Sequence, residues 1–444
     1  MRESGTVSLS FDRDELIRGA QVFFFALFAA TLALPGVWGA PGVRNSIVVA
    51  FGLLVAWRAV LQIRFARGRA APVAVFLLKK EHYFQILFHG TFFVYWALWW
   101  HEAVVHLPLF FVQLAFAYVF DMLLSWTRGK EWFIGFGPIP IVTSLNFFLW
   151  VENEYFFAHF LIVAFALSCR HFITWERDGR RRHIFNPSSF PLAVFALILM
   201  AGNLLWVTQG ADVILSFTLA PHGVLVLFLI GLAVNAVVPT VLITGSAVAA
   251  TFLANYVTFL ITGEHLTPLP YDPNVMLGMT LLVTDPATSP RGNVARAMFG
   301  FTYGLLTLVD FWGLSSLRQP GYFDKILAVP VVNLLVPFFE RVGGAVEKRL
   351  RAFRSLSWGL DARWAHLAAW IAFFVYQAPT AATVRPAVLV VRGIPYTAAS
   401  SELLALQKWA TGECQREPRI CAPFGLPDEI IYLMTRTASG PRPH

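Results

Sequence analysis

Long apolar stretches separated by short basic loops run through most of the chain, and this pattern constrains the fold more than any other feature. Of the 444 residues, 57% are hydrophobic and only 14% are charged, whereas a soluble domain carries about 25% charged residues. Such a chain has too few polar side chains to cover a surface that faces water. The sequence therefore predicts an integral membrane protein whose main partner is the lipid bilayer.

A helix needs about 20 apolar residues to cross the hydrocarbon core of a bilayer. Enough stretches approach that length to predict an all-α polytopic bundle with about 10–13 transmembrane spans. The candidate spans are 17–34, 44–63, 83–100, 107–126, 133–150, 155–175, 188–206, 213–237, 239–262, 273–284, 297–314, 325–340 and 364–383. The stretches 273–284 and 325–340 are short, which favours broken or re-entrant helices surrounded by protein or by a water-filled cavity.

Lys and Arg gather in alternate loops, and this asymmetry predicts the orientation. These residues are Arg64, Arg67, Arg69, Lys79, Lys80, Arg128, Lys130, Arg170, Arg177, Arg180, Arg181, Arg182, Arg291, Arg296, Lys348, Arg349, Arg351 and Arg354. All of these loops fall on the side of the N-terminus, and positively charged loops stay in the cytoplasm. We therefore expect a cytoplasmic N-terminus and an outer C-terminal tail. Because the net charge of +8 comes largely from these loops, we expect no nucleic-acid partner.

The predicted organisation has five parts. They are a cytoplasmic segment 1–16, a transmembrane bundle 17–340, a basic cytoplasmic loop 341–363, a final span 364–383 and a polar outer tail 384–444. In the tail, Cys414 and Cys421 are compatible with a disulfide and equally with two unpaired thiols. Cys169, at a helix end, is expected to be a packing residue. No CxxC pair is present, so we expect no metal site.

Some polar and small residues lie inside predicted helices. Asp121 and Asp310 are costly there, so each either faces a partner or cavity or reaches the interface from a span end. The segment 244–250 is a stripe of Thr, Gly, Ser and Ala. It predicts close packing of two helices, with the approach of a planar ligand as the alternative.

Two polar loops carry the strongest chemical signal. The first reads HIFNPSSF from His183 to Phe190 and leads into a span, with Asn186 placed as an N-cap and proline in the first turn. Ser188 and Ser189 then lie at the positive end of the helix, a position that suits an anion. An ordinary capped helix start is the alternative.

The second loop reads TDPATSPRG from Thr284 to Gly292. It ends a short span with two prolines, an aspartate and three hydroxyl side chains. A helix broken by proline beside polar groups is a common way to build a binding site inside a membrane protein. An ordinary capped turn is again the alternative.

Together the two loops resemble a known family. TDPATSP is similar to the TDPxTSP signature of RnfD-type subunits and of the B subunit of sodium-translocating NADH:quinone reductase (NqrB), and HIFNPSSF is similar to the HIFNP segment of that family. The resemblance covers about 170–340 and continues through Gly300, Gly304, Asn333 and Pro337. It implies two related five-helix halves, an architecture similar to urea transporters, and a flavin-carrying subunit of an ion-pumping complex in the bacterial cytoplasmic membrane.

The chain also departs from this family. The family attaches FMN to the threonine of an SGAT motif, and no SGAT occurs here. We therefore expect no covalent FMN, and at most FMN or riboflavin held noncovalently. The departures point to a divergent branch, similar to the RnfD-like membrane proteins found beside enediyne biosynthesis genes.

Two functions follow from the resemblance. The first is a membrane subunit in flavin-linked electron transport, partnered by other subunits of a redox complex. The second is a carrier or channel on the urea-transporter-like scaffold, or a membrane component of natural-product biosynthesis without redox activity. No pattern identifies catalytic residues.

We expect the two loops to lie together on the cytoplasmic side and to bound one pocket. Asp285 would accept hydrogen bonds from Asn186 or from backbone amides near Ser188. Ligand contacts would come from the loop side chains, with a phosphate near the arginine. The predicted cofactor-binding residues are Asn186, Ser188, Ser189, Thr284, Asp285, Thr288, Ser289 and Arg291.

Overall fold

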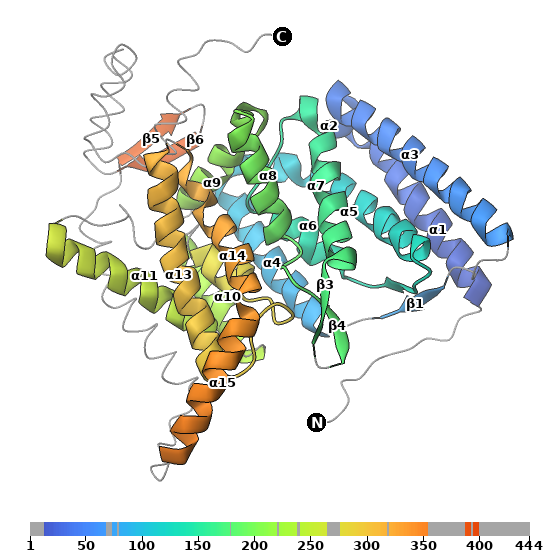
Figure 1. Ribbon diagram of the computed structural model, residues 1–444. Helices are drawn as coiled ribbons and strands as arrows, with labels where there is room; N and C mark the ends of the chain where they lie inside the picture. The colour runs from blue at the N-terminus through green and yellow to red at the C-terminus, as the bar shows by residue number, and fades with distance from the viewer. Residues whose placement is uncertain are drawn as a thin grey trace. The chain divides into compact units, whose positions relative to one another are not determined.

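The computed structural model describes residues 13–67, 73–77, 80–177, 179–219, 222–237, 240–263, 276–317, 319–353, 387–391 and 394–398. Within these ranges the chain is almost entirely helical (Figure 1), which confirms the predicted all-α class. The chain divides into two compact units, Met1–Trp175 with Val207–Gly210 and Glu176–Trp206 with Ala211–His444. The relation expected between two five-helix halves stays a prediction.

The first unit is arranged around one long helix. Its elements are α1 (Arg13–Ala30), η1 (Thr31–Ala33), α2 (Pro35–Trp38), α3 (Pro41–Ala66), β1 (Ala74–Phe76), α4 (Lys80–Trp99), α5 (His101–Thr127), β2 (Trp132–Ile134), α6 (Pro138–Asn146), η2 (Asn153–Tyr155) and α7 (Phe157–Phe172). Helix α5 packs against α1, α3, α4, α6 and α7. Aromatic side chains fill the contacts, with the rings of Phe116 and Phe160 only 4.5 Å apart.

The second unit carries both polar loops. Its elements, with those at its boundary, are β3 (Thr174–Arg177), β4 (Arg180–His183), α8 (Ser189–Ala201), η3 (Leu205–Val207), α9 (Gly210–Leu219), α10 (Gly223–Val237), α11 (Val241–Thr262), the π-helical η4 (Gly278–Leu282), α13 (Asn293–Ser316), η5 (Gly321–Phe323), α14 (Asp324–Leu334), α15 (Val336–Phe353), β5 (Ala387–Val391) and β6 (Ile394–Ala398). Helix α13 packs on α11, α14 and α15, and α8 packs on α14 (Figure 1).

The small-residue stripe brings two helix backbones into direct contact. A methyl group on Gly300 of α13 would collide with the carbonyl oxygen of Ile243 on α11, and one on Gly304 with the carbonyl oxygen of Ala247. Only glycine allows this approach, which is how small residues stabilise helix pairs in lipid. Close packing, the first of the two interpretations of the stripe, is therefore confirmed.

Four described helices are long and apolar enough to cross a bilayer, namely α3, α5, α11 and α13. The pair formed by Gly321–Leu334 and Val336–Arg349 would make a fifth span, but it is bent by 63°, as expected for a broken helix at 325–340. Other predicted spans are shorter helices. The stretch 133–150, for example, holds β2 and the nine-residue α6, because glycines and Pro138 interrupt the apolar run.

The region after residue 340 differs from the predicted loop. Helix α15 continues through it to Phe353, because residues 341–353 contain no proline and many good helix formers. The final span 364–383, Cys414 and Cys421 lie outside the described residues. Cys169 is a free, buried cysteine, and Asp121 is buried with its carboxylate 2.9 Å from His171 Nε2.

Candidate functional site

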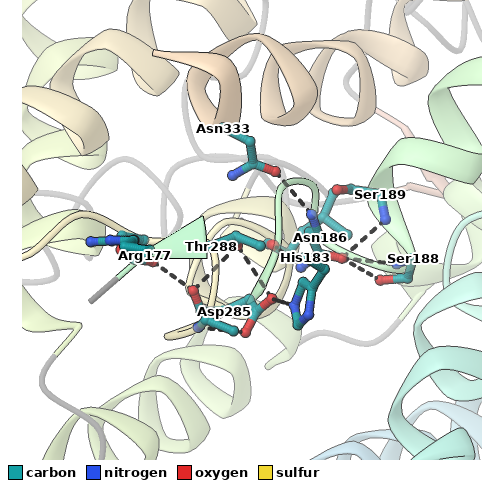
Figure 2. Close-up of polar contacts among 11 residues, drawn as sticks. Arg177, His183, Asn186, Ser188, Ser189, Asp285, Thr288 and Asn333 are labelled. Carbon is teal, nitrogen blue, oxygen red and sulfur yellow. Dashed lines mark hydrogen bonds and ion pairs between the residues drawn. The ribbon is translucent and has the colours of Figure 1, made fainter. Parts of the chain in front are cut away.

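The two polar loops lie against each other in the second unit. The side-chain nitrogen of Asn186 donates to the carbonyl oxygen of Leu282 at 2.9 Å, and His183 Nε2 lies 3.2 Å from Asp285 Oδ2. Figure 2 shows the ring of His183 facing Asp285, with Asn186 beside them. The two segments are about a hundred residues apart in sequence, so their meeting confirms the prediction that they lie together. We call this region the loop junction (residues 183–189, 284–291 and Asn333).

Asn186 organises the first loop. Its Oδ1 accepts hydrogen bonds from the backbone N–H of Ser188 at 2.9 Å, from the Ser188 hydroxyl at 2.8 Å and from the backbone N–H of Ser189 at 3.1 Å. Helix α8 begins at Ser189, later than the sequence suggests, and Asn186 caps it from three residues upstream. The cap satisfies donors at the helix start that would otherwise lack partners.

Asn333 of α14 is the residue that the predicted site lacked. It is fully buried, and its Oδ1 accepts a hydrogen bond of 3.0 Å from the backbone N–H of Asn186. Its Nδ2 is buried without a hydrogen-bond partner in the described part of the chain, and so is the hydroxyl of Ser189. A buried polar group without a partner costs about 1–3 kcal/mol. The junction therefore retains two buried polar groups whose hydrogen-bonding capacity the described residues leave unused.

Asp285 organises the second loop. Its carboxylate accepts from the backbone N–H of Ala287 at 3.0 Å and from the hydroxyl of Thr288 at 3.2 Å. Its carbonyl oxygen accepts from the hydroxyl of Ser289 at 2.7 Å. The predicted bonds from Asn186 or from amides near Ser188 to this carboxylate are absent among the described contacts, because Asn186 Oδ1 takes those amides and His183 takes the carboxylate.

The electrostatics of Asp285 reflect these contacts. Burial alone would raise the pKa of its carboxyl group. The hydrogen bond and charge of His183, the N–H of Ala287 and the hydroxyl of Thr288 outweigh burial and hold the pKa below its ordinary value of 3.8. Asp285 is therefore an ionised acceptor that holds its own loop in shape.

Arg177 and Glu340 connect the second loop to α15. Arg177 donates to the carbonyl oxygen of Ser289 at 3.1 Å and forms an ion pair with Glu340. Glu340 also accepts from the backbone N–H of Arg291 at 2.8 Å. In the sequence, Arg177 was interpreted only as one of the basic residues that orient the protein in the membrane. Arg177 and Glu340 lie 163 residues apart, so no local sequence pattern predicts their ion pair.

The predicted site residues differ in exposure. Asp285 is half-buried and Arg291 is exposed, while the other six are buried. Thr284 bonds back to the carbonyl oxygen of Thr280 at 2.6 Å, so its hydroxyl serves the helix. Of the eight, Ser189 keeps an unpartnered side-chain group, and Arg291 presents its charge at the surface.

The loop junction is rich in polar side chains. Its polar side chains are hydroxyls, amides, the hydrogen-bonded carboxylate of Asp285, the imidazole of His183 and the guanidinium of Arg291, and such groups are suited to recognise a polar ligand. Within the described ranges no group of three His, Cys, Asp or Glu residues is placed to hold a metal ion.

A second buried polar cluster lies in the first unit. The amides of Gln113 and Asn146 bond each other at 2.8 and 3.2 Å, and His106 Nε2 lies 3.2 Å from Asn146 Oδ1. The ring of His106 stacks on Trp150 with centroids 3.8 Å apart. These groups satisfy one another, so the cluster stabilises the packing of α5 on α6.

Comparisons with known proteins do not identify the chain, because no protein-family model and no curated protein matches it. The likeness of the two loops to RnfD and NqrB therefore depends on their own residues.

Proposed function

We propose that the protein is a membrane subunit of the RnfD/NqrB type that holds a flavin noncovalently at the loop junction and takes part in electron transport with other membrane subunits. The observation that carries the proposal is the pair of buried, unpartnered groups, Ser189 Oγ and Asn333 Nδ2. They occur where the two loops that resemble the family meet, which supports a ligand at this place.

The residues present fit a flavin ring. An isoalloxazine ring offers carbonyl oxygens and ring nitrogens as acceptors at its polar edge. The Asn333 amide and the Ser189 hydroxyl are both donors, so a ring edge beside either of them would satisfy a group that the described residues leave without a partner. Arg291, exposed at the end of the second loop, suits a phosphate. A bound flavin would supply the ability to accept and release electrons.

The contacts assign different roles to the other loop residues. The hydroxyls of Thr288 and Ser289 and the carboxylate of Asp285 already bond within their loop. They position the backbone of the second loop, so their effect on a ligand is indirect. Direct recognition falls to Ser189 and Asn333.

The test is the colour of the purified full-length protein. We expect visible flavin absorbance, either as isolated or after adding FMN or riboflavin. On a denaturing gel we expect no flavin fluorescence at the mass of the protein, because the chain has no SGAT threonine. A protein that stays colourless with both flavins would refute the proposal.

Two serines provide a matched pair of variants. Ser189→Ala removes a hydroxyl that has no hydrogen-bond partner among the described residues, so it should leave stability unchanged or slightly raised. It should weaken flavin binding about tenfold, roughly 1.4 kcal/mol. Ser188→Ala removes a hydroxyl that donates to Asn186, so it should lower stability and spare flavin binding. The reverse result would contradict the assignment of Ser189.

A second candidate function is a carrier for a small polar solute. The 63° bend between the two helices of the broken pair favours it, because broken helices often form transport sites. The same Ser189 and Asn333 donors would then bind the solute. A colourless protein that moves a solute into liposomes, with uptake reduced by Ser189→Ala, would support this function over electron transport.

A further inference from the structure

Helix α15 runs antiparallel to α13 and packs along its first turns. The ring centroids of Phe339 and Phe299 lie 6.0 Å apart. Further along α15, Glu347 Oε1 accepts a hydrogen bond of 2.9 Å from the backbone N–H of Val294, in the first turn of α13. Residue numbers therefore rise along α15 while they fall along α13. Because α15 continues to Phe353, it extends past the start of α13 (Figure 1).

This packing gives the depth of α15 in the bilayer. Helix α13 is long and apolar enough to cross the hydrocarbon core, and its apolar stretch follows Arg296. Phe338, directly before the phenylalanine that contacts α13, lies at the level of that stretch. Arg341 follows one turn later, at its boundary, and Lys348 and Arg349 lie level with the first residues of α13 or beyond them. The three cations therefore lie where the hydrocarbon gives way to lipid headgroups.

Five exposed residues share one side of α15. They are Phe338, Arg341, Ala345, Lys348 and Arg349, and their spacing of three and four residues places them on one helix face. We call this surface the basic face. Within the described ranges no hydrogen bond or ion pair engages the side chains of its three basic residues. Their charges are therefore open to a partner outside the described chain.

The acids of α15 lie on the opposite side of the helix. Glu340 is paired with Arg177, and Glu347 accepts from the start of α13. Both carboxylates are therefore turned toward the protein, while the basic side chains are turned away from it. A helix face that only meets water commonly alternates charges of both signs. The basic face carries a single sign, so it is complementary to an anionic surface.

Apolar side chains continue the surface toward the membrane interior. Phe338 is 54% exposed, and Leu334 and Val331 of α14 are also exposed large hydrophobic residues. An exposed apolar group beside a row of Lys and Arg is the composition of helices that lie at a membrane interface. Long basic side chains can also keep their stems among acyl chains while the charged ends reach the headgroups.

We propose that the basic face of α15 binds anionic phospholipid headgroups. Arg341, Lys348 and Arg349 hold the phosphate, and the acyl chains lie against Phe338. Guanidinium and ammonium groups form charge-assisted hydrogen bonds to phosphate oxygens, and basic residues beside a bilayer attract anionic lipids. The preferred lipid has a headgroup with net negative charge, such as phosphatidylglycerol. Phosphatidylcholine, whose amine neutralises its phosphate, binds more weakly.

The test is the quenching of a fluorophore on the basic face by labelled lipids. The full-length protein, with its three native cysteines replaced by serine, carries a dye at Ala345→Cys in phosphatidylcholine vesicles. The quencher is a small fraction of phosphatidylglycerol or phosphatidylcholine with a nitroxide on the acyl chain near the headgroup. We expect phosphatidylglycerol to bind at least about threefold more tightly, since one basic residue near an anionic surface contributes on the order of fivefold. Added salt should reduce the preference.

Two sets of neutralised variants locate the effect. The triple variant Arg341→Gln/Lys348→Gln/Arg349→Gln should make the two lipids quench equally. The double variant Arg64→Gln/Arg67→Gln removes two exposed charges at the end of α3 and should leave the preference in place. A preference that survives in the triple variant, or that the double variant abolishes equally, would overturn the proposal.

Two further measurements keep the proposal open to refutation. A dye at Ser316→Cys, exposed at the opposite end of α13, should be quenched equally by both lipids, and an equal preference there would contradict a site on α15. If a labelled or neutralised variant does not fold, phosphatidylglycerol should still raise the unfolding midpoint of the unlabelled parent in detergent more than phosphatidylcholine does. Equal effects of the two lipids on the parent would overturn the assignment and favour an acidic protein segment as the partner. None of these measurements requires a flavin, so they can succeed or fail separately from the proposed function.

Discussion

The backbone N–H of Asn186 donates to the side-chain oxygen of Asn333 across 147 residues of sequence. Asn186 also donates to Leu282 through its side chain and accepts three hydrogen bonds from the start of α8. One buried asparagine therefore connects the first loop, α14 and the end of η4. The energetic consequences of this arrangement can be measured.

Asn186→Ala should lower the free energy of unfolding by about 3 kcal/mol. The change removes the cap of α8, worth about 1 kcal/mol, and leaves the buried carbonyl oxygen of Leu282 without a donor, at about 1–3 kcal/mol. Thermal unfolding in detergent measures the loss. Asn293→Ala, at an exposed position of α13, is the control and should stay within about 0.5 kcal/mol of the parent. Equal stability of the two variants would contradict the role of Asn186.

Asp285→Asn should destabilise the protein in a pH-dependent way. Because the folded-state pKa of Asp285 lies below its ordinary value of 3.8, the carboxylate stabilises the fold above that pH. This contribution is lost as the pH falls through the lowered pKa. The difference in unfolding free energy between parent and variant should therefore be largest above about pH 4 and shrink in acid. Glu176→Gln, at an exposed acid, gives the baseline, and a difference that grows in acid would contradict the assignment.

Gly300→Ala and Gly304→Ala should each lower the free energy of unfolding by about 1–3 kcal/mol or more. The added methyl group meets backbone carbonyl oxygens of α11, which cannot move aside as a flexible side chain can. Gly313→Ala lies on the same helix with no atom within 4 Å of the new methyl group, so it should be neutral or gain up to about 1 kcal/mol. Unfolding midpoints in detergent compare the three. Similar behaviour of all three variants would show that the close contact is not needed.

The orientation can be tested with single cysteines in a variant whose three native cysteines are replaced by serine. The positive loops predict that Arg181→Cys faces the cytoplasm and that Glu154→Cys faces outside. Both positions are exposed. In intact cells a membrane-impermeant maleimide should modify Glu154→Cys, and should modify Arg181→Cys only after permeabilisation. The opposite labelling pattern would reverse the topology.

The sequence predicted the class of fold because hydropathy is a local signal. It predicted the meeting of the two loops because the charge bias of the loops placed both on the same side of the membrane. It did not predict the length of each helix. An apolar run such as 133–150 can continue through a turn, since lipid and protein interior both accept the side chains while glycine and proline still end the helix. The segment after residue 340 was predicted as a loop because it is basic, but it forms part of helix α15. Charged residues lower hydropathy without breaking a helix.

The partners at the site were harder to predict than the loops. Asn333, Arg177 and Glu340 reach the junction from separate elements, and a single sequence contains no signal for such pairings. The ion pair of Asp324 and Lys325 at the start of α14 stands at the edge of an expected loop, where charges are ordinary, and only the packing of Gly278 and Tyr303 shows that it is buried.

The lengths of α8 and α14 have a consequence for how the protein assembles. At 13 and 11 residues these helices extend about 20 and 16 Å, well short of a hydrocarbon core of about 30 Å. Neither can be stable alone in lipid, where its unpaired ends would meet hydrocarbon. Helices α11 and α13 can insert independently and pair first. We therefore expect the loop junction and the ion pair of Asp324 and Lys325 to be completed late in biogenesis, when the short helices dock on helices already inserted.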